Sequence, residues 1–136
     1  MLIDGIGTDI VEIARIKDIA LRKGSLFLDR VFSRSELDFC FKRTDPYPCL
    51  AARFAAKEAV FKSLGTGLSG CRWTDVEVVR EVTLAPQINL SGSAARIAEG
   101  KGIKKILISI SHDRGRAVAF ALAVKGGGPG NESCDC

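Results

Sequence analysis

The alternation of hydrophobic and polar positions divides the first half of the chain into one strand and three helices. A two-residue period predicts a strand over residues 2–12, and a helical period follows over 13–23. The spacing Ser33-x-x-Glu36 is typical of a capping box, so we expect a second helix to begin there and to end before Asp45. The strongest helical pattern runs over residues 49–65 and ends in a glycine-rich segment.

The second half of the chain is richer in strands. We expect strands over residues 73–79 and 87–90, a helix that begins at Ser91 or Gly92 and reaches Glu99, and strands over 103–111 and 117–124. The chain therefore predicts one domain of mixed helices and strands over residues 1–124. Residues 125–136 are rich in glycine and are expected to form a flexible tail.

The last predicted strand is apolar on both faces. Alanines occupy every second position from Ala117 to Ala123, and larger residues from Val118 to Val124 occupy the positions between them. This pattern favours a central strand that is covered on both sides, with a helix packed closely on the alanine face.

Composition narrows the class of protein. Hydrophobic residues make up 46% and charged residues 26% of 136 residues, values that are ordinary for a soluble globular domain. No apolar run approaches the ~20 residues of a membrane span. The N-terminus shows no basic leader, so we expect a cytoplasmic protein that does not associate with membranes.

The cysteines are five in number, and an odd count argues against a disulfide scaffold. Cys40, Cys49 and Cys71 stand singly and are expected to be small packing residues. Cys134 and Cys136 form a C-x-C sequence in the tail, without a second ligand pair for a metal nearby.

The net charge of +4 favours acidic or phosphorylated partners without distinguishing among them. Aromatic residues are only 7% of the chain and do not alternate with basic residues, as they do on the stacking platforms that bind single-stranded nucleic acid. We therefore do not expect a nucleic-acid-binding protein.

The first strand carries a carboxylate where its pattern predicts a buried face. Asp9 shares that face with aliphatic residues and with Gly5 and Gly7, which leave room for a ligand or for another backbone. Asp9 could cap a helix that starts near Glu12, could pair with a lysine, or could belong to a binding site; the pattern leaves these alternatives open.

The helix over residues 49–65 has no polar face, yet it contains Arg53, Lys57, Glu58 and Lys62. One interpretation is a Glu58–Lys62 ion pair together with two side chains that extend to solvent. The interpretation that fits the missing polar face better is a site for a polyanion. In it, the three basic residues contact phosphates and Glu58, with Asp9, holds a cation such as Mg²⁺. The only histidine, His112, follows Ser111 at the end of a strand, where contact with a phosphate is plausible.

Three segments resemble the signature blocks of the holo-acyl-carrier-protein synthases, which are 4'-phosphopantetheinyl transferases. They are Gly5-Ile-Gly-Thr-Asp-Ile-Val-Glu-Ile13, Arg53-Phe-Ala-Ala-Lys-Glu-Ala-Val-Phe-Lys-Ser-Leu-Gly-Thr-Gly67 and Ser109-Ile-Ser-His-Asp113. The resemblance extends over about residues 2–124. It implies an α+β fold, a single phosphopantetheinyl-transferase-like domain in which a small, mainly antiparallel sheet packs on a long buried helix.

The resemblance also implies a reaction. A serine of an apo acyl carrier protein attacks the β-phosphate of coenzyme A, receives 4'-phosphopantetheine and releases 3',5'-ADP, in a Mg²⁺-dependent step of fatty acid biosynthesis. Asp9 and Glu58 match the metal ligands, and Lys62 would neutralise charge on the phosphates as a third catalytic residue. Arg53, Lys57, Ser111 and His112 would contact coenzyme A. The general base stays open between Glu58 and a water molecule.

The short members of this family are homotrimers with active sites between subunits, so the resemblance implies the same assembly. The acidic carrier protein would dock on the helix over residues 13–23, with Arg15 and Arg22 as contacts, although runs of charge are often simply solvated faces. The alternative function is another Mg²⁺-dependent enzyme that acts on a nucleotide or phosphate at the same site.

Overall fold

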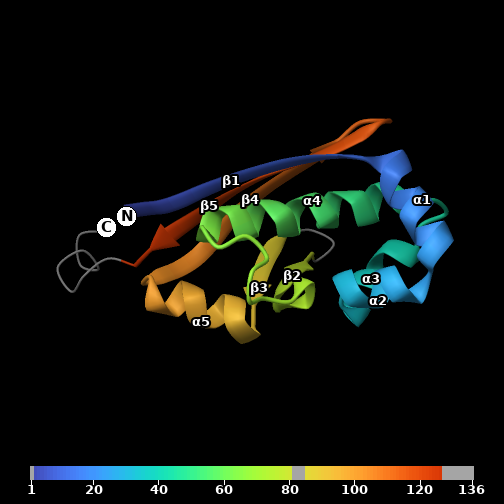
Figure 1. Ribbon diagram of the computed structural model, residues 1–136. Coiled ribbons are helices and arrows are strands. Elements are labelled where there is room, and N and C mark those ends of the chain that lie inside the picture. The colour runs from blue at the N-terminus through green and yellow to red at the C-terminus, as the bar shows by residue number, and fades with distance from the viewer. Residues whose placement is uncertain (1, 81–84, 127–136) are drawn as a thin grey trace.

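The computed structural model describes residues 2–80 and 85–126 of the chain. One strand, four consecutive helices and a short turn are followed by two strands, a helix and two strands (Figure 1). In chain order the elements are β1 (Leu2–Glu12), α1 (Ile13–Lys23), α2 (Ser25–Val31), α3 (Arg34–Phe41), α4 (Tyr47–Leu64), the short 3-10 turn η1 (Trp73–Asp75), β2 (Val76–Val79), β3 (Gln87–Leu90), α5 (Gly92–Gly100), β4 (Ile103–His112) and β5 (Arg116–Lys125).

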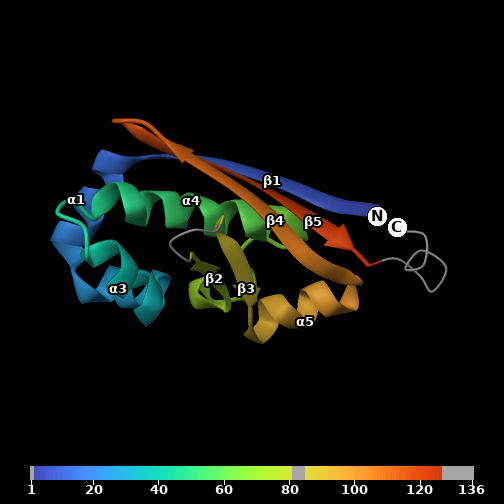
Figure 2. The same cartoon turned by 180° about the vertical axis from the view of Figure 1, so that it is seen from behind.

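Helix α4 lies in the middle of the molecule, with a sheet on one side and smaller elements on the other. Three antiparallel strands in the order β1-β5-β4 form the sheet, and β2 pairs with β3 in a second antiparallel pair. The second pair and α5 lie across α4 from the three-stranded sheet, and α1, α2 and α3 gather at one end (Figures 1 and 2). This arrangement confirms the predicted α+β fold with a long buried helix.

Glycines in β1 let α4 approach the sheet closely. A Cβ atom on Gly7 would overlap the carbonyl oxygen of Ala59, and one on Gly5 would overlap that of Ser63. Side chains larger than hydrogen at these positions would push strand and helix apart. The space predicted beside Asp9 is therefore filled by another backbone, that of α4.

Strand β5 is central, as predicted, and its alanine face is fully buried against α4. Its other face is not covered, which corrects the prediction of a strand covered on both sides. Phe120 is 51% exposed, and the exposed side chains Ile6, Ile10 and Leu107 lie beside it on the neighbouring strands. Figures 1 and 2 show no element of this chain over that face of the sheet.

The structure also corrects the expectation for two cysteines. Cys40 at the end of α3 and Cys49 in the first turn of α4 form a disulfide, because the short connection between the helices folds back on itself. Both residues are buried, so they also pack in the core. Cys71 has no disulfide partner among the described residues, and residues 134 and 136 lie outside them.

Several boundaries differ from those predicted. The capping box is present, because the Ser33 hydroxyl accepts from Glu36 N and the Glu36 carboxylate accepts from Ser33 N. Helix α2 was not predicted, and residues 73–75 form a 3-10 turn where a strand was expected. Strand β5 runs to Lys125, and the remainder of the predicted tail, 127–136, lies outside the described residues. In the described part of the chain, no helix has the length and hydropathy of a membrane span.

Candidate active site

Two carboxylates and a lysine meet where β1 passes over α4. The close approach at Gly7 brings Asp9, two residues further along the strand, beside Glu58 and Lys62. Lys62 Nζ lies 3.4 Å from Asp9 Oδ1 and donates a hydrogen bond of 2.9 Å to the carbonyl oxygen of Thr8. Of the alternatives for Asp9, pairing with a lysine is therefore confirmed, and a binding role remains compatible with it because the Lys62 side chain is 52% exposed.

The charges of this cluster favour a cation. Partial burial raises the pKa of Glu58, the negative charge of Asp9 raises it further, and Lys62 offsets part of the effect. A divalent ion bound between the two carboxylates would stabilise the ionised form of Glu58. No group of three or more potential metal-ligating side chains occurs among residues 2–80 and 85–126. Two protein carboxylates fit Mg²⁺, which usually keeps several waters and binds substrate phosphate.

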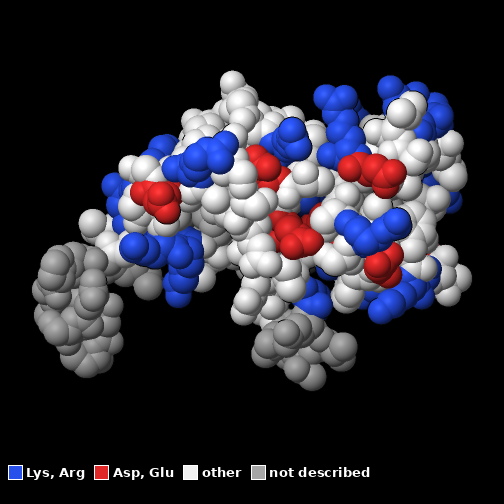
Figure 3. All heavy atoms as spheres, turned by 90° about the horizontal axis from the view of Figure 1, so that it is seen from below, with Lys and Arg blue, Asp and Glu red and all other residues white. Residues whose placement is uncertain are grey.

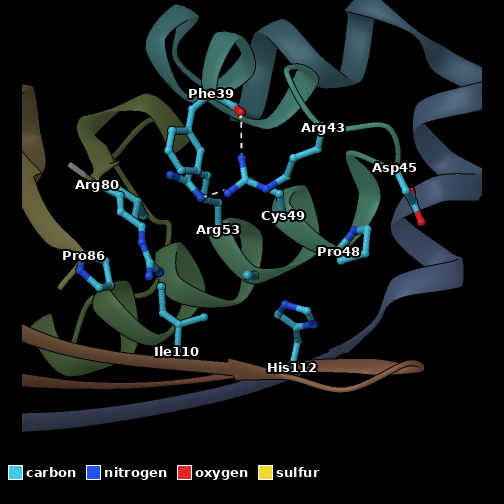
Figure 4. A pocket seen from close by; sticks show the side chains of 12 residues that line it. Phe39, Arg43, Asp45, Pro48, Cys49, Arg53, Arg80, Pro86, Ile110 and His112 are labelled. Carbon is cyan, nitrogen blue, oxygen red and sulfur yellow. Dashed lines mark hydrogen bonds between the residues drawn. The ribbon is translucent and has the colours of Figure 1, made fainter. Parts of the chain in front are cut away.

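A second concave region lies on the other side of α4, between α3, the end of β2 and the end of β4 (Figure 4). Its walls combine aromatic and cationic side chains, and they include Phe39, Arg43, Asp45, Pro48, Cys49, Arg53, Arg80, Pro86, Ile110 and His112. Arg43 donates a hydrogen bond of 3.0 Å to the carbonyl oxygen of Phe39. We call this region the cationic pocket.

Arg53 is the buried cation of the cationic pocket. Its guanidinium lies 4.4 Å from the centre of the Phe39 ring and donates to Cys49 Sγ at 3.3 Å. The side chain is only 5% exposed, and its Nε has no hydrogen-bond partner among residues 2–80 and 85–126. Burial, together with the positive charges of Arg43 and Arg80, lowers the pKa of Arg53 to about 10, although Glu36 opposes this shift. The pocket is thus short of negative charge, which an anionic ligand would supply.

Lys57 was predicted to contact a phosphate, but the structure does not bring it to either site. Its side chain is completely buried, and Nζ lies 2.9 Å from Glu36 Oε1, which is buried as well. Nζ also donates to the carbonyl oxygens of Trp73 and Val76. Lys57 therefore joins α4 to α3 and β2. The alternative interpretation had Arg53 and Lys57 extending to solvent, and both side chains are buried instead.

Glu36, Arg43 and Arg80 are the residues that sequence reasoning missed. Glu36 was identified only as a helix cap, yet its second oxygen accepts from Val78 N at 2.8 Å inside the core. Arg43 and Arg80 lie in segments whose pattern gave no sign that they would meet Arg53 across the fold. Contacts between residues that are distant in sequence leave no pattern in the sequence around each of them.

Ser111 and His112 were expected together, but strand alternation separates them. His112 points into the cationic pocket from the end of β4, whereas Ser111 is paired with Val118 and faces the uncovered side of the sheet. Asp9, Glu58 and Lys62 are absent from the walls of this pocket. One chain therefore carries two separate groups of candidate site residues on opposite sides of α4: the carboxylate cluster of Asp9, Glu58 and Lys62, and the cationic pocket.

Comparison with known proteins identifies the family to which a chain with these two groups of residues belongs. The family model of the 4'-phosphopantetheinyl transferase superfamily matches residues 5–121, which include both the carboxylate cluster and the cationic pocket. The chain belongs to this family. A holo-[acyl-carrier-protein] synthase of Desulforudis audaxviator is 51% identical over 123 residues, 90% of this chain and 94% of the relative. One from Caldanaerobacter subterraneus is 46% identical over 121 residues, 89% of this chain and 94% of the relative.

Solved structures of this phosphopantetheinyl transferase family share the fold. The holo-[acyl-carrier-protein] synthase of Neisseria meningitidis superposes with a TM-score of 0.84 at 32% identity. The match covers 91% of this chain and 100% of the Neisseria chain. The Helicobacter pylori synthase in complex with coenzyme A superposes with a TM-score of 0.76 at 34% identity. The match covers 87% of this chain and 98% of the Helicobacter pylori chain. The resemblance seen in the three sequence blocks is confirmed.

Helix α1 of this phosphopantetheinyl transferase presents a basic outer face. Arg15 and Arg22 are both exposed, and Arg22 Nε lies 2.9 Å from Asp18 Oδ2 in an exposed ion pair. Figure 3 shows blue side chains at the end of the molecule that carries α1, α2 and α3 and also at the opposite end, with acidic residues among them. Leu26 in α2 is 80% exposed nearby, so the face offers both charge and an apolar contact.

Proposed function

We propose that this chain transfers 4'-phosphopantetheine from coenzyme A to a serine of an apo acyl carrier protein, and releases 3',5'-ADP. The observation that carries the proposal is the convergence of Asp9, Glu58 and Lys62 beside an open surface, in a member of the phosphopantetheinyl transferase family. Relatives that share up to 51% identity over most of the chain bear the name of this activity. A solved relative binds coenzyme A.

Asp9 and Glu58 would hold Mg²⁺ through their carboxylate oxygens. When bound, the ion would neutralise charge on the diphosphate of coenzyme A, which makes the bridging oxygen a better leaving group. Burial and, to a smaller extent, the charge of Asp9 raise the pKa of Glu58, and a bound cation would counter both effects by stabilising the ionised carboxylate.

Lys62 would place its ammonium group against the transferring phosphate. In the structure this group is held by Asp9 and Thr8 at the edge of α4, and half of the side chain is open to solvent. A positioned ammonium stabilises negative charge that develops on phosphate oxygens in the transition state. The carrier serine would lose its proton to Glu58 or to a water molecule.

The cationic pocket would bind the phosphoadenosine end of coenzyme A. Arg43, Arg53, Arg80 and His112 would supply donors for phosphate. The Nε of buried Arg53, which has no partner in the described part of the chain, would donate to an anion that enters. Phe39 lines the same wall and offers an aromatic surface for a base.

The active enzyme would be a homotrimer in which each site combines the carboxylate cluster of one subunit with the cationic pocket of another. Two facts support this assembly. The two groups of residues lie apart within one chain, and the outer face of the sheet exposes an apolar patch that consists of Ile6, Ile10, Leu107 and Phe120. We call it the sheet patch. An uncovered apolar face of this kind marks an interaction surface.

Acidic acyl carrier protein would dock on α1 through Arg15 and Arg22. Both side chains are exposed on one face of the helix, and charge complementarity would steer the carrier toward the neighbouring site. The absence of a membrane-spanning helix in the described residues agrees with carrier and enzyme meeting in the cytoplasm.

The function is tested by following 3',5'-ADP release from coenzyme A with apo carrier, with a carrier whose acceptor serine is replaced by alanine, and without carrier. We expect release only with the intact apo carrier and Mg²⁺. Release at an equal rate without a carrier would contradict the proposal, because it is the behaviour of a Mg²⁺-dependent hydrolase that uses the same site.

Subunit complementation tests the shared site. Glu58→Gln disables the carboxylate cluster, and Arg53→Gln with His112→Ala disables the cationic pocket. We expect little activity from either preparation at low coenzyme A. Trimers reassembled from an equal mixture should recover about a quarter of wild-type activity, because each site in a heterologous ring joins two independently drawn subunits. No recovery in mixed trimers would show that each chain completes its own site.

A further inference from the structure

The Cys40–Cys49 disulfide lies at the wall of the cationic pocket. It joins the end of α3 to the first turn of α4, with the two Cα atoms 5.5 Å apart. Cys49 lines the pocket directly (Figure 4), whereas Cys40 behind it is 0% exposed. No part of the proposed transfer reaction uses either sulfur.

The bridge restrains the residues that supply the charge of the pocket. The eight residues between the two cysteines contain Arg43, Asp45 and Pro48, which all line the pocket. On the helix side, the Arg53 guanidinium donates to Cys49 Sγ at 3.3 Å. The sulfur atoms therefore fix the connecting segment on one side and contact the buried guanidinium on the other.

We propose that Cys40 and Cys49 form a reversible dithiol–disulfide site that controls the affinity of the cationic pocket for its nucleotide. The disulfide form binds more tightly, because the bridge holds Arg43 and Arg53 in the arrangement that the ligand requires and removes freedom that binding would otherwise have to restrict. The inference rests on the proposed nucleotide role of this pocket.

Thiol–disulfide exchange with a low-molecular-weight disulfide forms the bridge. The Cys49 thiolate, reached through the pocket and stabilised by the Arg53 guanidinium, attacks one sulfur of the small disulfide and expels one thiolate. The Cys40 thiolate then attacks Cys49 Sγ in the mixed disulfide and expels the second small thiolate. Two protein thiols are oxidised, one small disulfide is reduced to two thiols, and the protons of the cysteines end on those thiols.

Peptide mapping tests the chemical step. Trypsin cuts after Arg34, Lys42, Arg43 and Arg53, so Cys40 and Cys49 fall into different peptides. We expect a linked pair of these peptides after treatment with oxidised glutathione and two separate alkylated peptides after reduction. The absence of the linked pair after oxidation would overturn the inference.

Calorimetric titration with 3',5'-ADP tests the control of affinity. We expect the oxidised protein to bind at least about fivefold more tightly than the reduced protein. By linkage, saturating 3',5'-ADP should disfavour reduction of the bridge by the same factor in a glutathione titration. A variant with serine at Cys71, Cys134 and Cys136 should keep the difference. Cys40→Ala and Cys49→Ala should bind like the reduced protein under both conditions.

The outcomes separate the two proposals. Equal binding by both forms, with the linked peptides present, would overturn the redox control and leave the nucleotide pocket standing. Failure of both forms to bind 3',5'-ADP would overturn the assignment of the pocket, and the control of its affinity with it. If the alanine variants do not fold, the oxidised and reduced forms of the triple serine variant make the same comparison.

Discussion

Replacing Lys57 by methionine distinguishes a buried structural lysine from a phosphate ligand. The ammonium group lies 2.9 Å from Glu36 Oε1, and both side chains are fully buried. Methionine fills a similar volume but leaves the Glu36 carboxylate in the core without its counter-charge. Breaking a buried pair by removing one partner costs about 3–5 kcal/mol. Burial also lowers the pKa of Lys57, so the site already disfavours an isolated charge.

The assay is urea unfolding followed by circular dichroism, at one fixed protein concentration because assembly would shift the midpoint. Lys62→Met is the matched control, since it changes the same residue type in the same helix. The Lys62 side chain is 52% exposed and its pair with Asp9 is correspondingly screened, so we expect a loss of less than about 1 kcal/mol. Lys62→Met should instead lose transfer activity.

The reasoning is refuted if Lys57→Met unfolds at the same urea concentration as Lys62→Met and loses affinity for coenzyme A. Lys57 would then be the phosphate ligand that the sequence pattern predicted. A double variant, Lys57→Met with Glu36→Gln, supplies a second check. It should recover part of the lost stability because no unpaired charge remains in the core.

Three further predictions follow from local geometry. Gly7→Ala should destabilise the fold by about 1–3 kcal/mol or more, because the added Cβ overlaps Ala59 and comes within 2.8 Å of Ser63 N. Gly115→Ala, with no atom nearer than 3.9 Å, is the control, and equal urea midpoints would contradict the close packing. Hydrogen bonds of 2.6 Å from Ser33 and Ser35 lower the pKa of Glu77 below its ordinary 4.5. Its ionised form therefore stabilises the fold above pH 4.5, and the contribution is lost as the pH falls through the lowered pKa. Glu77→Gln should reduce the dependence of the urea midpoint on pH between 3 and 6, and an unchanged dependence would argue against these bonds. Phe120→Asp should abolish the proposed trimer in light scattering without unfolding the subunit, whereas Leu26→Asp should not, although Leu26 on α2 is more exposed (80% against 51% for Phe120). A Phe120→Asp variant that remains trimeric would exclude the sheet patch as the interface.

Local patterns were sufficient for most elements of the fold. The alternation of β1, the capping box at Ser33 and the alanine face of β5 each depend on residues close in sequence, and each was confirmed. The 3-10 turn at Trp73 was missed because the pattern of the strand that follows does not reveal where the backbone tightens before it begins. The pairing of Cys40 with Cys49 depended on how the connection between α3 and α4 folds.

The candidate site was predictable where charge contradicts the pattern of burial. Asp9, Glu58 and Lys62 were identified in this way, and the structure brings them together. The same argument misplaced Lys57, because a buried charge can be satisfied by a ligand or by a partner such as Glu36, and periodicity does not show which. Ser111 and His112 are neighbours in sequence, but a strand turns consecutive side chains to opposite faces.

The most direct test of the central claim is the intact mass of an apo acyl carrier protein after incubation with this protein, coenzyme A and Mg²⁺. We predict that the carrier gains the mass of one phosphopantetheine group. The gain should disappear when EDTA is added or when the folded Glu58→Gln variant replaces the wild-type protein. An unchanged mass with the folded wild-type protein, across several apo carriers, would contradict the proposed transfer, and a full gain with Glu58→Gln would contradict the proposed site.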